Sequence, residues 1–182
     1  MINRIEIENF KSIRALDLPL RSINVLIGAN GVGKSNFINF FKLLDSLYNK
    51  RLQNYIAEEA GADNVLHFGL QHSDYLSGRL EFDATNTYTF TLKPNQEGGL
   101  YFETDKVAFK AAGFANWAVN NIGSGYTETA LKDRQEGGIA QHVNRYMNSF
   151  KVFHFHDTSK TAKIKQPQPI NNNLFFPEEE PN

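Results

Sequence analysis

The N-terminal segment shows the two-residue period of strands that have one buried face. Ile5 and Ile7 alternate with glutamates in "MINRIEIENF", and "RALDLPL" at residues 14–20 repeats the alternation with its leucines. Pro19 suits an edge strand because it has no N–H to donate. We expect the two segments to pair as an antiparallel hairpin over residues 3–20.

A different pattern follows the hairpin. The run "INVLIG" at residues 23–28 is almost continuously apolar and ends in glycine, which predicts a central strand covered on both faces. After a glycine-rich loop, apolar residues recur at helical spacing. They are Phe37, Phe40, Phe41, Leu44, Leu47 and Tyr48. Residues 23–50 therefore predict a strand, a loop and a helix in that order.

Beyond Gly61 the period returns to two. "RLEFD", "TYTFTLK" and "GGLYFET" predict an antiparallel β insert over about residues 65–105, with a turn at residues 84–86. Two later segments, 114–123 and 137–150, predict helices between about residues 108 and 150, and "KVFHFHD" predicts a strand over residues 151–156. Residues 160–182 hold four of the six prolines and three successive asparagines, which predicts either a poorly packed tail or a truncated connection.

Charge and composition narrow the class of protein. The 19 lysines and arginines nearly balance the 20 acidic residues, so no overall positive field attracts nucleic acid or anionic membrane. The absence of cysteine from the sequence excludes disulfides, thiolate nucleophiles and cysteine-ligated metals. The first residues lack the apolar core of a secretory signal, and no run is long enough to span a membrane. We expect a soluble, cytoplasmic protein with no membrane partner.

The loop "GANGVGKS" at residues 28–35 satisfies the pattern G-x-x-x-x-G-K-[ST] between the predicted strand and helix. In this pattern, backbone N–H groups point inward around phosphates, and glycines permit the turns and the close approach. The start of the helix adds unpaired amides and the positive end of its dipole. Lys34 would bridge the β- and γ-phosphates, and Ser35 would offer its hydroxyl to Mg²⁺. The candidate ATP site comprises Gly28, Ala29, Asn30, Gly31, Val32, Gly33, Lys34, Ser35 and Asn36.

The motif leaves other interpretations open. The glycines could form only a sharp strand-to-helix turn, with Lys34 as a solvated surface residue. The reaction is also undetermined, because GTPases, kinases, helicases and transport ATPases share the loop. For a GTPase, the guanine-reading Asn-Lys-x-Asp is needed, and residues 49–52 read Asn-Lys-Arg-Leu. A regulatory module that binds nucleotide without turnover is a further alternative.

Two features resemble the RecF, SMC and OLD-like branch of ABC-type ATPases, which includes antiphage-defence ATPases. In that branch a first strand ending in Asn-Phe precedes a loop that reads Asn-Gly-x-Gly-Lys-Ser-Asn, and here Asn9, Phe10, Asn30 and Asn36 match. "VLHFG", followed by "GRLEFD" and "YTFTL", resembles the β-subdomain of the branch. The resemblance covers residues 1–92 well and residues 93–159 in outline; Val32 departs from the small polar residue that is commoner there.

The resemblance implies an α/β fold of the ABC ATPase head type, with a mixed sheet and an antiparallel β-subdomain. Residues 1–159 would be its N-terminal lobe, with Lys11 and Ser12 approaching the nucleotide from the first hairpin. It also implies a loop near residues 154–159 that usually presents a glutamine to Mg²⁺ and the attacking water. That glutamine is missing from this stretch, and His156 or Asp157 could replace it.

Three other patterns are weaker. Asp157 ends an apolar strand, as the magnesium-binding Asp of a hydrolytic site does, but histidines interrupt the strand and Thr158 stands where a Glu is expected. "YLSGRL" at residues 75–80 resembles the signature motif of ABC ATPases but leads into a strand, so a strand edge is the better interpretation. His154 and His156 face one way on a strand without further ligands nearby in sequence, which favours a structural role over a metal site.

The prediction for function is ATP binding with Mg²⁺ by the N-terminal lobe of an ATPase. We expect the parent protein to hydrolyse ATP through dimerised heads, and this chain alone to be inactive, because the sequence contains neither an apolar strand ending in Asp-Glu nor a signature helix. Family analogy points to DNA maintenance or antiphage defence, with a homodimer, DNA, or a nuclease or effector as partner.

Overall fold

The computed structural model describes residues 1–111, 113–134 and 137–150. They form six strands, four α-helices and one 3-10 helix. The strands are β1 (Ile2–Phe10), β2 (Ile13–Pro19), β3 (Leu76–Phe82), β4 (Asn86–Pro94), β5 (Leu100–Phe109) and β6 (Ala118–Gly123). The α-helices are α1 (Lys34–Tyr48), α2 (Leu52–Glu58), α3 (Ala62–Val65) and α4 (Gly138–Met147), and the 3-10 helix is Leu131–Asp133.

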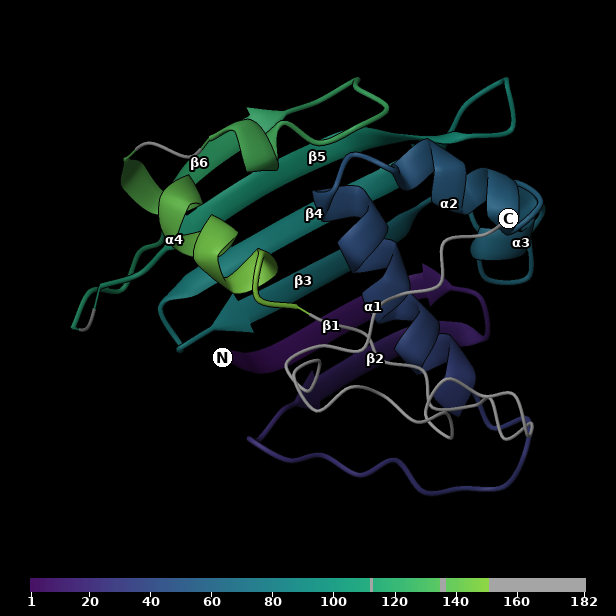
Figure 1. The fold of residues 1–182 in the computed structure, drawn as a ribbon, viewed down its shortest axis with the longest axis horizontal. Coiled ribbons are helices and arrows are strands. Elements are labelled where there is room, and N and C mark those ends of the chain that lie inside the picture. Colours follow the sequence, from purple (N-terminus) through teal and green to yellow (C-terminus); the bar gives the residue numbers. More distant parts are fainter. Residues whose placement is uncertain (112, 135–136, 151–182) are drawn as a thin grey trace, which may run out of the picture. The chain divides into compact units, whose positions relative to one another are not determined.

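The strands form one antiparallel sheet in the order β2-β1-β3-β4-β5-β6 (Figure 1). The hairpin predicted from the N-terminal alternation is confirmed, since β1 and β2 pair with Ile5 opposite Leu18. The strands predicted after Gly61 are also confirmed. They do not form a separate insert, however, because β3 pairs directly with β1, with Ile5 opposite Leu80.

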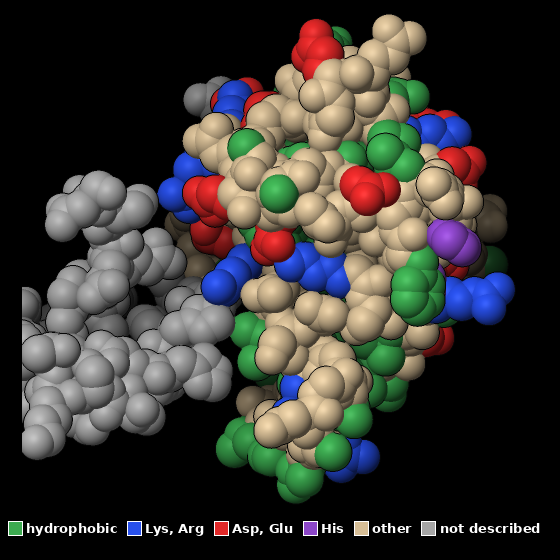
Figure 2. All heavy atoms as spheres, turned by 90° about the vertical axis from the view of Figure 1, so that its right-hand side faces the viewer, with side chains coloured by type: hydrophobic (Ala, Val, Ile, Leu, Met, Phe, Trp, Pro, Cys, Tyr) green, Lys and Arg blue, Asp and Glu red, His purple; other side chains and the backbone are tan. Residues whose placement is uncertain are grey.

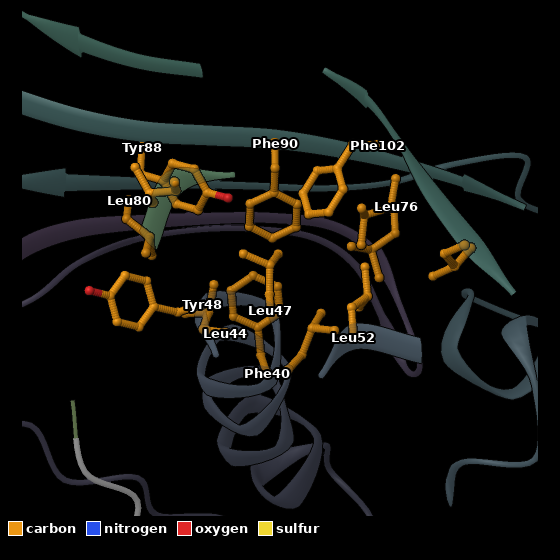
Figure 3. Packing of buried hydrophobic residues seen from close by; sticks show 14 of the residues in the cluster. Phe40, Leu44, Leu47, Tyr48, Leu52, Leu76, Leu80, Tyr88, Phe90 and Phe102 are labelled. Atoms are coloured by element: carbon orange, nitrogen blue, oxygen red, sulfur yellow. The ribbon is translucent and has the colours of Figure 1, made fainter. Parts of the chain in front are cut away.

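The core lies between the helices and one face of the sheet (Figure 3). Phe40 and Leu44 of α1 are fully buried because the helix repeat places them on the side that faces the sheet. The ring of Phe40 meets Phe10 edge-on, with centroids 5.4 Å apart, and stacks at 6.3 Å on Phe90. Each such buried side chain stabilises the fold by roughly 1.5–3 kcal/mol relative to exposure.

The structure gives a reason for the glycine in "YLSGRL", which is Gly78. A Cβ atom at this position would lie 2.5 Å from Cζ of Phe90 and 2.9 Å from Cζ of Phe40. Gly78 is in the middle of β3, which pairs on one side with β1 and on the other with β4. The interpretation as a strand is therefore confirmed, and the glycine makes room for two aromatic rings of the core.

The predicted central strand over residues 23–27 is wrong. These residues adopt no regular secondary structure, and the side chains of Ile23 and Ile27 are 82% and 90% exposed. A strand covered on both faces needs hydrogen-bonded neighbours and packed layers. The described sheet ends at β2, which pairs only with β1, so no described strand lies beside this segment. For the same reason the described residues contain no parallel pairing, and the mixed sheet is not seen in them.

One predicted helix is also wrong. Residues 118–123 of the segment "FANWAVNNIG" form β6, which pairs with β5 so that Val119 lies opposite Ala108. Valine, isoleucine and asparagine are weak helix formers, and the open side of β5 satisfies their backbone groups better. The helix predicted over 137–150 is confirmed as α4.

Several predictions lie outside the described residues. They are the strand over residues 151–156, the tail 160–182, and the candidates His154, His156 and Asp157. No helix in the described ranges has both the length and the apolar character needed to cross a membrane.

Candidate functional site

The start of α1 presents backbone amides that the helix itself cannot pair. Gly31 and Gly33 have φ angles of 85° and 97°, the left-handed region that glycine adopts at little cost. Gly33 is the residue before the helix, and its carbonyl accepts a 3.0 Å hydrogen bond from the N–H of Phe37. The intervening amides of residues 34–36 lie in the first turn, where an α-helix has no carbonyl to offer. Among the described residues no side chain caps this helix, so the amides are available to an anion.

Lys34 adds a positive charge at the same place. Its ammonium donates hydrogen bonds to the carbonyl oxygens of Gly28, at 2.6 Å, and Ala29, at 2.7 Å. The side chain thus folds back over the loop that precedes its own helix. Ser35, the next residue, is exposed and can offer a hydroxyl oxygen to a cation. No acidic residue of the first turn opposes an anion.

The turn between β1 and β2 contacts this loop through Ser12. The side-chain amide of Asn36 donates to the hydroxyl of Ser12 at 2.7 Å. A Cβ atom on Gly33 would lie 3.1 Å from the same hydroxyl, so the close approach adds to the constraint that the left-handed φ places on Gly33. The structure therefore brings Ser12 next to Gly33 and Asn36 at the start of α1.

Lys11 is directed elsewhere. Its ammonium lies 2.6 Å from a carboxylate oxygen of Glu59, and its side chain is only 14% exposed. Its N–H donates to the carbonyl of Val65, and its own carbonyl lies 2.7 Å from Nδ1 of His67. Lys11 thus joins the β1–β2 turn to the segment around α3, whereas Ser12 joins it to the loop.

The donor set fits a polyphosphate with a divalent cation. The loop supplies helix amides and an ammonium for phosphate oxygens, and Ser35 supplies a hydroxyl oxygen for a metal. Mg²⁺ normally keeps several waters and is held by one or two protein groups together with substrate phosphates. It does not require a cage of three or more acidic or histidine side chains, and the described ranges contain no such cage.

A shallow hollow that the sequence did not predict lies beside the β1–β2 turn. Its lining residues are Lys11, Ser12, Asp63, Asn64, Leu66, Phe68 and Gly69. Ser12 belongs both to this hollow and to the contact with the loop. In the sequence, "VLHFG" stands out only as the segment before the β strands, and a phenylalanine between histidine and glycine does not by itself indicate an exposed ring.

Comparison with known protein families matches residues 1–174 to the AAA ATPase domain. No curated protein matches the chain. The match extends over nearly the whole sequence and includes the glycine loop, the start of α1 and every described strand. An AAA ATPase domain implies ATP as the ligand and ATP hydrolysis as the reaction, and members typically bind ATP with Mg²⁺. The chain belongs to the AAA ATPase domain family.

Proposed function

We propose that residues 28–36 hold the triphosphate of ATP and that Ser35 binds the accompanying Mg²⁺. One observation carries the proposal: α1 starts without a side-chain cap directly after left-handed Gly33, with the Lys34 ammonium folded over the same loop. Each element of this arrangement favours a negatively charged ligand.

The contacts of Lys34 support binding rather than oppose it. Its two acceptors in the loop are neutral carbonyls of Gly28 and Ala29. Phosphate oxygens are anionic, so they attract the ammonium through their charge in addition to the hydrogen bond, which a neutral carbonyl does not do. An arriving triphosphate can therefore displace the carbonyls from the ammonium.

We also propose a finer place for the chain within the ATPases. Asn9 and Phe10 end β1, and Asn30 and Asn36 flank residues 31–35 of the loop, as in the RecF, SMC and OLD-like branch. In that branch two heads dimerise around ATP, so we propose a homodimer of the parent protein and a function in DNA maintenance or antiphage defence. Residues 1–159 would be the N-terminal lobe of one head, and any DNA, nuclease or effector partner follows from this analogy.

Isothermal calorimetry with Mg²⁺-ATP tests the proposed site. The wild-type chain should bind Mg²⁺-ATP. Lys34→Ala should abolish measurable binding because it removes the positive charge that attracts the phosphates. Lys42→Ala is the matched control, since Lys42 lies on the same helix eight residues later and belongs to no part of the site. Equal affinity of the wild type and Lys34→Ala would refute the assignment. Loss of binding in Lys42→Ala as well would show that the effect is not specific to the loop.

A further inference from the structure

Phe68 is an aromatic residue held at the surface in a costly conformation. Its side chain is 73% exposed, although most of the large aromatic residues of β1, α1, β3 and β4 are buried. Its φ angle is 53°, in the left-handed region that a bulky residue rarely adopts. The ring is not buried, so no burial energy offsets the exposure of the ring or the strain of the backbone. Backbone outliers of this kind concentrate at functional sites, where the surrounding structure holds them in place.

Hydrogen bonds on both sides fix the conformation of Phe68. The N–H of Gly69 donates to the carbonyl of Leu66 at 3.2 Å, and the N–H of Leu70 donates to a carboxylate oxygen of Asp63 at 2.8 Å. Nδ1 of His72 lies 3.0 Å from the carbonyl oxygen of Phe68. These hydrogen bonds hold the turn in one conformation, and the side chain of Phe68 lies on its solvent-exposed side.

Two histidines flank the ring. The imidazole of His67 lies 4.4 Å from the Phe68 ring, and that of His72 lies 6.1 Å from it, measured between centroids. Hydroxyl Oγ of Ser73 also donates to the carbonyl of His67 at 2.8 Å. These contacts limit the ways in which the ring can turn, and a pre-positioned ring loses little entropy when a ligand stacks on it.

The hollow connects Phe68 to the phosphate-binding loop. Phe68 and Ser12 both line it, and the hydroxyl of Ser12 accepts the hydrogen bond from Asn36 at the start of α1. Figure 2 shows the side of the molecule that carries α3 and the β1–β2 turn, where hydrophobic side chains lie next to a histidine. Asp63 and Asn64 add polar groups to the lining, so the hollow combines one apolar ring with hydrogen-bonding neighbours.

We propose that this hollow is the subsite for the base of the nucleotide, with the base stacked on the ring of Phe68. The inference rests on the proposed function, because the loop would fix the triphosphate while the hollow receives the other end of the same ligand. Every base has a π-face that can stack on an aromatic side chain, and such stacking contributes strongly to affinity. Asp63 and Asn64 would meet the polar edge of the base from the lining of the hollow.

The test compares two ligands that share the triphosphate, of which only ATP also carries the ribose and the base. ATP and inorganic tripolyphosphate are each titrated with Mg²⁺ into the 182-residue chain and into Phe68→Ala. We expect Phe68→Ala to lower the affinity for ATP by about 5- to 150-fold, the range measured when a stacking aromatic is removed, and to leave the affinity for tripolyphosphate unchanged. Phe68→Trp, which keeps a ring, should retain tight ATP binding.

Phe114→Ala is the matched control, because Phe114 is similarly exposed, at 69%, and lies in the connection between β5 and β6. It should leave both affinities unchanged. An unchanged ATP affinity in Phe68→Ala would overturn the inference, and so would an equal loss for both ligands, which would indicate damage to the loop. If tripolyphosphate binds through Lys34 but ATP binds no more tightly, the proposed function stands and the base subsite fails. If neither ligand binds the wild type, both proposals fail.

Discussion

The substitution Asp105→Asn should stabilise the protein at neutral and alkaline pH. Asp105 lies in β5 and is only 3% exposed, so its carboxylate is removed from water. One oxygen accepts a 2.5 Å hydrogen bond from the hydroxyl of Thr129, while the other, Oδ1, has no hydrogen-bond partner within the described ranges. Burial raises the pKa of Asp105 from 3.8 to about 6, and the hydroxyl groups of Thr129 and Tyr88 oppose only part of this effect.

The magnitude follows from the pKa. A tenfold change in proton affinity corresponds to about 1.4 kcal/mol, so a rise in pKa from 3.8 to about 6 corresponds to about 3 kcal/mol. The folded state holds the proton more tightly than the unfolded state. The stability that this provides is complete below pH 3.8 and is lost as the pH rises through about 6. An asparagine has no charge to bury, and its side-chain oxygen can still accept the hydrogen bond from Thr129.

Urea unfolding followed by circular dichroism between pH 4 and 8 measures the effect. We expect Asp105→Asn to gain up to about 3 kcal/mol of unfolding free energy over the wild type at pH 8, and almost none near pH 4. Asp74→Asn, which changes an exposed aspartate, is the matched control and should show no comparable trend. A gain that does not vary with pH, or a loss of stability at pH 8, would refute the reasoning.

Two further predictions concern packing. Gly78→Ala should cost about 1–3 kcal/mol of unfolding free energy, since the added methyl group would press against Phe90; urea unfolding measures it, and an unchanged midpoint would contradict the close approach. Ile27→Ser should change the unfolding free energy by less than about 0.5 kcal/mol because Ile27 is exposed, whereas Ile7→Ser, at a fully buried position, should cost more than about 2 kcal/mol. A large loss for Ile27→Ser would show that residues 23–27 are buried after all.

The alternation of apolar and polar residues was enough to predict most of the sheet. It placed the β1–β2 hairpin and the strands β3 to β5, because each of them has one face toward the helices and one toward solvent. The hydrophobic pattern was misleading at residues 23–27, where a continuous apolar run indicates burial but does not say which element would cover it. It also failed at β6, where pairing with β5 outweighs a weak helical pattern.

One part of the candidate site could be predicted from the sequence pattern and another part could not. The loop from Gly28 to Ser35 is local in sequence, so its spacing alone predicted a glycine turn followed by a helix. The contact of Ser12 with Asn36 joins residues 24 positions apart, and the resemblance to a family, rather than any pattern, pointed to Ser12. The position of Phe68 in the lining of the hollow could not be predicted, because the hollow forms where the β1–β2 turn meets the segment after α3.

The backbone amide resonances of the loop test the central claim most directly. Mg²⁺-ATP is added to isotopically labelled wild-type chain and to Lys34→Ala, and the amide shifts are followed residue by residue. We predict that the largest changes in the wild type fall on residues 28–36 and that they disappear in Lys34→Ala. Changes confined to other residues, or the same changes in both proteins, would contradict it.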